Sequence, residues 1–154
     1  MTISHILVPV DLSEDSLEAL RTGCEVAKQF SACLDMLHVV EPLPPSADLM
    51  LVNVYDDIRQ DMQGELDKLP CSDLPLGSVR RIVRLGYAAQ TITDFARNEG
   101  VDLIILGTRG RTGLAHLLMG SVAERVIRTA PCPVLVTRNK PKTSIPESLR
   151  LGTP

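Results

Sequence analysis

Glycine and hydroxyl side chains gather in residues 107–121, which read GTRGRTGLAHLLMGS. Four of the chain's ten glycines lie in this stretch, namely Gly107, Gly110, Gly113 and Gly120. Glycine allows positive φ and a close approach of the backbone, so several N–H groups can point into one concavity. A helix predicted to begin near Ser121 would add unpaired N–H groups and its dipole. The stretch therefore predicts a phosphate-binding loop, although ordinary turns also use glycine.

The side chains of this stretch could add further hydrogen bonds to a phosphate. The candidates are Arg109 and Arg111 as cationic donors, and Thr108, Thr112 and Ser121 as neutral ones. Two alternatives stay open. The arginines can simply be solvated, and Ser121, with Glu124 three residues later, has the spacing of a capping box that would satisfy the helix instead of a ligand.

Two common phosphate motifs are excluded by the spacing of the glycines. The chain contains no Gly-Lys dipeptide, which a P-loop requires. Gly107, Gly110 and Gly113 are spaced by three residues each, which is not the GxGxxG of dinucleotide-binding folds. The predicted loop is therefore neither of the Walker type nor of the dinucleotide type.

Apolar runs and helical patterns alternate along the chain and predict the elements that position the loop. Strands are expected at residues 5–10, 33–40, 79–85, 101–106 and 133–138, and helices at 14–30, 49–69, 87–98 and 121–129. This order implies right-handed crossovers and an α/β fold, a three-layer α/β/α sandwich around a five-stranded parallel sheet. Ligands of such sheets bind beyond the carboxyl ends of the strands, where the loop begins.

The first helix carries the clearest local signals. Ser13 is a candidate N-cap, and Glu14 and Asp15 suit the first turn. The expected buried stripe consists of Leu17, Leu20, Cys24, Ala27 and Phe30.

Several polar and thiol side chains are expected to have no special role. Arg80, Arg81 and Arg84 alternate along the third strand and should face solvent. The three histidines are scattered, without a sequence neighbour that would make one a catalytic base. Cys24, Cys33, Cys71 and Cys132 show no CxxC or metal-ligand spacing, so we expect small apolar residues with free thiols in a reducing compartment.

Composition indicates a folded protein without membrane or nucleic-acid partners. The chain has 154 residues, 44% of them hydrophobic, and a net charge of −3. No apolar run reaches the roughly 18–20 residues that span a bilayer, and the start lacks the pattern of a leader, so we expect a cytoplasmic protein. We expect residues 1–138 to form the domain and residues 139–154 to be a mobile tail without a function of its own.

The spacing Gly107-x2-Gly110-x9-Gly120-Ser121 resembles the G-2x-G-9x-G(S/T) motif of the universal stress protein family, in its ATP-binding branch. The resemblance covers residues 3–138 and includes the segments ILVPVD, LHVVEP, DLIILGTRGRTG and MGSVAERVIRTAPCPVLV. It implies a fold like that of the adenine nucleotide alpha hydrolases, which is Rossmann-like.

The resemblance also implies where ATP would lie, at the carboxyl ends of the first, second and fourth strands. Adenine and ribose contacts are implied for Pro9, Val10, Asp11 and Val39. The phosphate end is implied for Gly107, Thr108, Arg109, Gly110, Gly113, Gly120, Ser121 and Val122, with Arg111 and Thr112 inside the loop. Asp11 could instead cap the first helix, Val39 could be only a strand end, and Pro9 could merely shape an edge. Residues 42–77 give no firm alignment.

The family resemblance further implies a homodimer in which the last strand, from Pro133 to Arg138, pairs antiparallel with its copy. An apolar edge strand with the sequence Val134-Leu135-Val136 would invite association unless it were covered, which agrees with this expectation. The alternative is that the C-terminal tail hides the strand.

Three functions compete. The first is an ATP-binding signalling or stress-response module that acts as a dimer on an unknown protein partner, with Mg²⁺ or Mn²⁺ possible beside the phosphates. The second is a scaffold of the same fold that works without a nucleotide. The third is a slow ATPase, for which no catalytic constellation and no metal ligands are visible; an adenylating enzyme would need an SGGxDS-like loop that VPVDLSEDS lacks.

Overall fold

The computed structural model of this chain describes residues 2–42, 51–71, 73–108 and 119–138. Five strands form a single sheet in the order β3-β2-β1-β4-β5. They are β1 (His5–Pro9), β2 (Cys33–Val40), β3 (Val79–Leu85), β4 (Leu103–Gly107) and β5 (Val134–Thr137). Every neighbouring pair is parallel, so all five carboxyl ends meet at one edge of the sheet.

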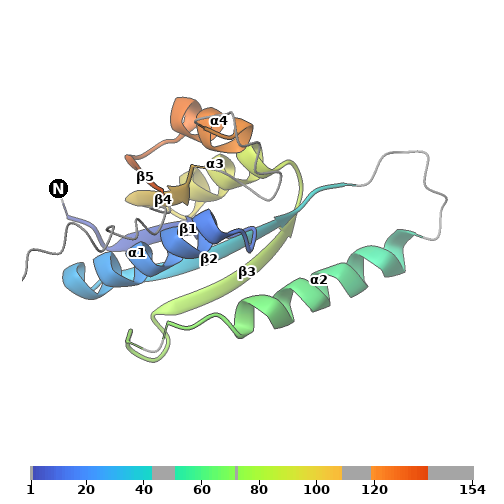
Figure 1. The fold of residues 1–154 in the computed structure, drawn as a ribbon, viewed down its shortest axis with the longest axis horizontal. Helices are drawn as coiled ribbons and strands as arrows, with labels where there is room; N and C mark the ends of the chain where they lie inside the picture. The colour runs from blue at the N-terminus through green and yellow to red at the C-terminus, as the bar shows by residue number, and fades with distance from the viewer. Residues whose placement is uncertain (1, 43–50, 72, 109–118, 139–154) are drawn as a thin grey trace, which may run out of the picture.

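Helices cover both faces of this sheet (Figure 1). They are α1 (Glu14–Phe30), α2 (Leu51–Asp67), α3 (Ala88–Asn98) and α4 (Ser121–Thr129). Buried residues of α1 and α2 share one hydrophobic cluster with one face of the sheet, and those of α3 and α4 share a second cluster with the other face. The predicted three-layer α/β/α sandwich is therefore confirmed.

Strand β1 lies at the centre of the sheet, with β2 on one side and β4 on the other. Its residues Ile6, Leu7 and Val8 are fully buried and alternate between the two clusters, as a strand covered on both faces requires. The same burial explains the nearly continuous apolar sequence of β4.

Helix α1 confirms its predicted bounds and cap. Ser13 is the N-cap, and its side chain accepts a hydrogen bond from the N–H of Ser16. The helix ends at Phe30 because Ser31 adopts the left-handed conformation, with φ of 54°. The prediction that Phe30 belongs to the buried stripe is wrong: its side chain is 50% exposed, since it lies at the end of the helix beyond the edge of the core.

Two of the three β3 arginines do not simply face solvent, contrary to the prediction. Arg80 pairs with the buried carboxylate of Asp35, and its guanidinium also reaches Glu99. Arg81 is half-buried, and it donates to the carbonyl oxygens of Leu66 and Leu69, each at 3.0 Å. The groups that Arg80 and Arg81 contact belong to other segments of the chain. Arg84 is exposed, as predicted.

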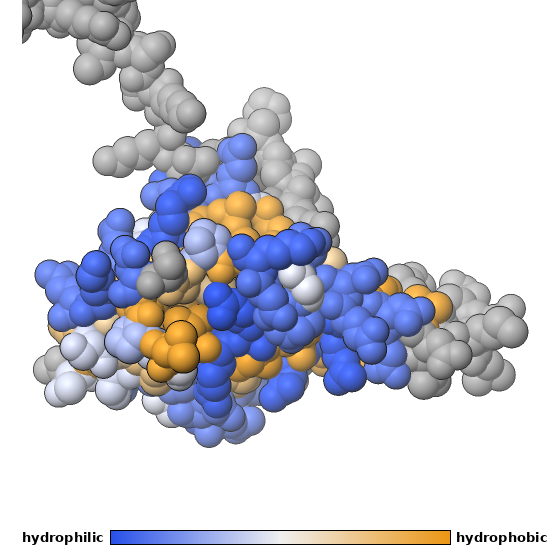
Figure 2. All heavy atoms as spheres, turned by 90° about the horizontal axis from the view of Figure 1, so that it is seen from below, coloured by the Kyte–Doolittle hydropathy of each residue, from blue (hydrophilic) through white to orange (hydrophobic). Residues whose placement is uncertain are grey.

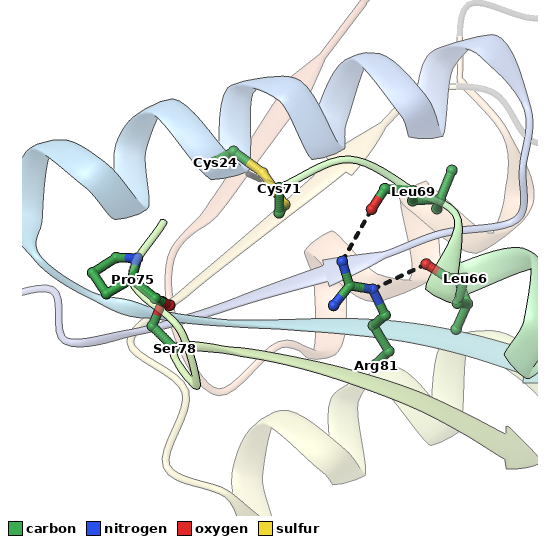
Figure 3. The surroundings of a disulfide bond; sticks show 7 residues. All are labelled: Cys24, Leu66, Leu69, Cys71, Pro75, Ser78 and Arg81. Atoms are coloured by element: carbon green, nitrogen blue, oxygen red, sulfur yellow. Dashed lines mark hydrogen bonds between the residues drawn. A yellow bond between two sulfur atoms is a disulfide. The ribbon is translucent and has the colours of Figure 1, made fainter. Parts of the chain in front are cut away.

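The expectation of four free thiols is also wrong, because Cys24 and Cys71 form a disulfide (Figure 3). Cys24 lies on α1 and Cys71 in the connection between α2 and β3, and their Cα atoms are 6.3 Å apart. Helices α1 and α2 cover the same face of the sheet, which brings the two segments together. Cys33 and Cys132 are free, and burial raises the pKa of the Cys132 thiol.

No helix within the described part of the chain is both long and apolar enough to cross a membrane.

Candidate functional site

A cavity of about 510 Å³ opens at the carboxyl edge of the sheet. The predicted site residues that the structure describes all line it: Pro9, Val10, Asp11, Val39, Gly107, Thr108, Gly120, Ser121 and Val122. They come from the ends of β1, β2 and β4 and from the start of α4. The other predicted site residues lie outside the described residues; they are Arg109, Gly110, Arg111, Thr112 and Gly113.

Two hydrogen bonds hold Val10, which follows β1 and lines the cavity, against strand β2. The N–H of Val10 donates to the carbonyl oxygen of Leu37 at 2.9 Å. His38 is buried, and its Nδ1 lies 2.7 Å from the carbonyl oxygen of Val10. Because a carbonyl can only accept, Nδ1 carries the proton in this contact. His38 therefore fixes the turn that leads to Asp11, a role that no sequence neighbour indicated.

The Asp11 carboxylate lies at the rim of the cavity and orders the start of α1. Its Oδ1 accepts hydrogen bonds from both the N–H and the hydroxyl of Ser13. The alternative that Asp11 caps α1 is wrong, because Ser13 is the N-cap. Leu12, between them, has φ of 66°, a conformation that a residue with a side chain rarely adopts. The turn is thus held in one shape beside the cavity.

Thr108 is engaged within the protein on three sides. Its hydroxyl donates to Asp15 Oδ2 at 2.9 Å, and its N–H donates to the carbonyl oxygen of Thr137 at 3.0 Å. Its own carbonyl accepts from the N–H of Gly120 at 2.7 Å. These bonds join the end of β4 to α1, to β5 and to the start of α4. The hydroxyl proton of Thr108 is therefore used within the fold in this structure, and its predicted phosphate contact stays a prediction.

Gly107 is required for packing. A Cβ atom there would lie 2.7 Å from the backbone carbonyl carbon and oxygen of Asp15. Neither Gly107 nor Gly120 has a positive φ, so the predicted use of that freedom does not apply to these two positions. The close approach that glycine permits is real at Gly107, but the neighbour is helix α1.

The start of α4 lines the cavity and carries backbone N–H donors that have no acceptor among the described residues. Gly120 is the N-cap and provides no side-chain cap, and Glu124 is the first residue to donate back, to Gly120. Among the described residues, no acceptor bonds the N–H groups of Ser121, Val122 and Ala123. The capping-box alternative for Ser121 is wrong, because Ser121 is the first helical residue and not the cap. Such a helix start favours an anion.

The remaining wall of the cavity is largely apolar and was missed by the sequence prediction. It includes Ile58 and Met62 of α2, Ala88 and Ile92 of α3, and Val40. Glu41 also lies on the wall, and its Oε1 accepts from the N–H of Ala88 at 3.3 Å. The site therefore combines an apolar wall, suited to a flat ring, with a helix start suited to a phosphate.

Comparison with known proteins agrees with this architecture. Residues 2–138 match the universal stress protein family. The chain is 37% identical over 143 residues to universal stress protein MJ0531 of Methanocaldococcus jannaschii, a match that covers 89% of this chain and 82% of that protein. It is 33% identical to universal stress protein A homolog 1 of Coxiella burnetii, covering 88% and 96%.

Solved structures show the same fold. The structure of hypothetical protein MJ0577 has a TM-score of 0.79 and 28% identity, and the match covers 92% of this chain and 99% of that one. A universal stress protein in complex with cAMP has a TM-score of 0.68 and 19% identity, covering 91% and 100%.

Proposed function

Since this chain belongs to the universal stress protein family, we propose that it is an adenine-nucleotide-binding protein whose ligand is ATP, held in the cavity at the carboxyl edge of the sheet. The observation that carries the proposal is the convergence of the described predicted residues on one cavity. A protein of the same fold has been solved with cAMP, which supports an adenine nucleotide as the ligand class.

The residues present fit such a ligand. The apolar wall from Val39, Val40 and Ile92 would hold the adenine ring, and Asp11 would accept from a ribose hydroxyl. The N–H groups of Ser121, Val122 and Ala123, for which the described residues offer no acceptor, would hold phosphate oxygens. A divalent cation would neutralise phosphate charge when bound; among the described residues, no group of three acidic, histidine or cysteine side chains is placed to hold a metal by itself.

The proposed role is binding and signalling rather than catalysis. Two titratable side chains that line the cavity already hold its backbone: His38 donates to Val10, and Asp11 accepts from Ser13. Both contacts favour a fixed shape over proton transfer.

Filling the cavity tests the site. We expect Val39→Trp to weaken ATP binding by about tenfold or more, which is about 1.4 kcal/mol, because the indole would occupy space beside the apolar wall. Val39→Ala, the matched control, should bind within a few-fold of the unmodified protein. Calorimetric titration of each folded variant with ATP measures both. Equal ATP affinity in Val39→Trp and Val39→Ala would contradict the proposed site.

We further propose that β5 pairs with its copy in a homodimer. Strand β5 is at the edge of the sheet, and Leu135 on it is 41% exposed. Pairing would cover this apolar edge. We expect Leu135→Lys to halve the mass measured by light scattering, because two like charges would face each other across the two-fold axis. Leu76→Lys, at a fully exposed leucine, is the control; a monomeric unmodified protein would refute the pairing.

A further inference from the structure

A disulfide and several hydrogen bonds connect the C-terminal end of α2 to α1 and β3 (Figure 3). The Cys24–Cys71 bond joins α1 to the connection that follows α2. Beside it, Arg81 donates to the carbonyl oxygens of Leu66 and Leu69, at the end of the helix and just after it. Gln63 of α2 donates in turn to the carbonyl oxygen of Arg81 at 3.2 Å.

Helix α2 also forms a wall of the cavity, through Ile58 and Met62. Its outward side is hydrophilic, as Figure 2 shows, and Asp56, Asp57 and Asp61 are exposed. Only the inward side therefore packs on the sheet, against β2 and β3. The position of this wall depends on that packing and on the ties at its C-terminal end.

We propose that Cys24 and Cys71 are a reversible thiol–disulfide exchange site for low-molecular-weight disulfides, and that their bond strengthens nucleotide binding by holding α2 against the cavity. The coupling to affinity rests on the proposed function, whereas the exchange itself and its effect on α2 do not.

The thiol–disulfide exchange needs no metal and no electron carrier, because the small disulfide is itself the oxidant. One cysteine thiolate attacks a sulfur of the small disulfide RSSR, forms a mixed disulfide and releases RS⁻. The second cysteine thiolate attacks the cysteine sulfur of that mixed disulfide and releases the second RS⁻. Two protein thiols and one RSSR thus become one protein disulfide and two RSH. Both cysteines are half-buried and not sealed in the core, which leaves a route for the small disulfide.

The experiment compares oxidised and reduced protein. Oxidised glutathione or dithiothreitol sets the state, mass spectrometry after alkylation confirms it, and calorimetry measures the ATP affinity. We expect affinity at least about 5-fold weaker after reduction, the lower end of typical coupling between two sites. By reciprocity, saturating ATP should make the bond harder to reduce by the same factor.

Two variants and one structural readout complete the test. The double variant Cys24→Ser/Cys71→Ser should bind ATP with the affinity of the reduced protein, and dithiothreitol should not change that affinity. In Cys33→Ser, at an exposed free thiol, dithiothreitol should weaken ATP binding as it does in the unmodified protein. Hydrogen exchange over residues 54–67 should be faster after reduction, with or without ATP.

The outcomes separate the two proposals. Equal ATP affinity in both states overturns the coupling. If neither state binds ATP, the proposed function fails, and hydrogen exchange then tests whether the disulfide holds α2 in place. Faster exchange in α2 after reduction supports that effect of the disulfide, and unchanged exchange overturns it. Four free thiols after treatment with oxidised glutathione overturn the exchange site itself.

Discussion

Replacing Arg80 by methionine should lower the free energy of unfolding by about 3 kcal/mol. Asp35 is 1% exposed, and Arg80 binds both of its oxygens, with Nε–Oδ1 of 2.7 Å and Nη2–Oδ2 of 2.6 Å. These carboxylates, Asp35 first and then Glu99, raise the pKa of Arg80. Without the guanidinium, the buried carboxylate would keep the ring of His5, with Nε2 at 2.7 Å from Oδ2, as a hydrogen-bond partner. The value is at the low end for a buried pair because Arg80 is half-exposed and solvent screens it.

Two variants make this prediction specific. Arg84→Met removes an exposed arginine of the same strand and should change stability by less than about 0.5 kcal/mol. Asp35→Leu/Arg80→Met should recover much of the loss, because an apolar pair can replace a buried ion pair. Urea unfolding at neutral pH measures all three. If Arg80→Met is as stable as Arg84→Met, the buried pair does not matter to stability.

Replacing Gly107 by alanine should cost about 2–3 kcal/mol of stability and weaken nucleotide binding. The new Cβ would lie 2.7 Å from the backbone of Asp15, so no side-chain rotation could relieve the contact. Helix α1 would have to move away from β4, which would also stretch the bond between Thr108 and Asp15. Gly107 and Thr108 both line the cavity, so the displacement would reach the site.

Gly64→Ala is the matched control. Gly64 lies within α2, and a Cβ atom there would meet nothing within 4 Å. Alanine should stabilise the helix by about 0.5–1 kcal/mol because it restricts the unfolded chain and suits a helix better. Thermal unfolding of the two variants should therefore shift in opposite directions. A Gly107→Ala protein as stable as Gly64→Ala would show that α1 and β4 are not in tight contact.

The sequence pattern predicted the bounds of those helices and strands whose ends are set by their own residues. Helix α1 has its predicted bounds because Ser13 caps it and Ser31 ends it. Strands β2 and β3 also have their predicted bounds, since β2 is a mostly apolar run and β3 has arginines interleaved with apolar residues. Phe30 shows the limit: a periodic pattern does not reveal where the core ends beneath a helix.

Contacts between distant segments could not be predicted in the same way. Cys24 and Cys71 are separated by 47 residues, and only the crossovers of the sheet bring them together. Asp35 and Arg80 meet because β2 and β3 pair in register. At the site, strand ends and the start of α4 were predicted, whereas Ile58 and Met62 belong to a region without a clear alignment.

The central claim is that the cavity binds ATP, and the most direct measurement begins with freshly purified protein. The protein is denatured, any released nucleotide is identified by chromatography and mass, and the stripped, refolded protein is titrated with ATP, AMP and GTP by calorimetry, with and without Mg²⁺. We predict release of an adenine nucleotide or binding of ATP at about micromolar strength, about −8 kcal/mol, with GTP weaker. No released nucleotide, and no binding of any of the three under either condition, would contradict the account.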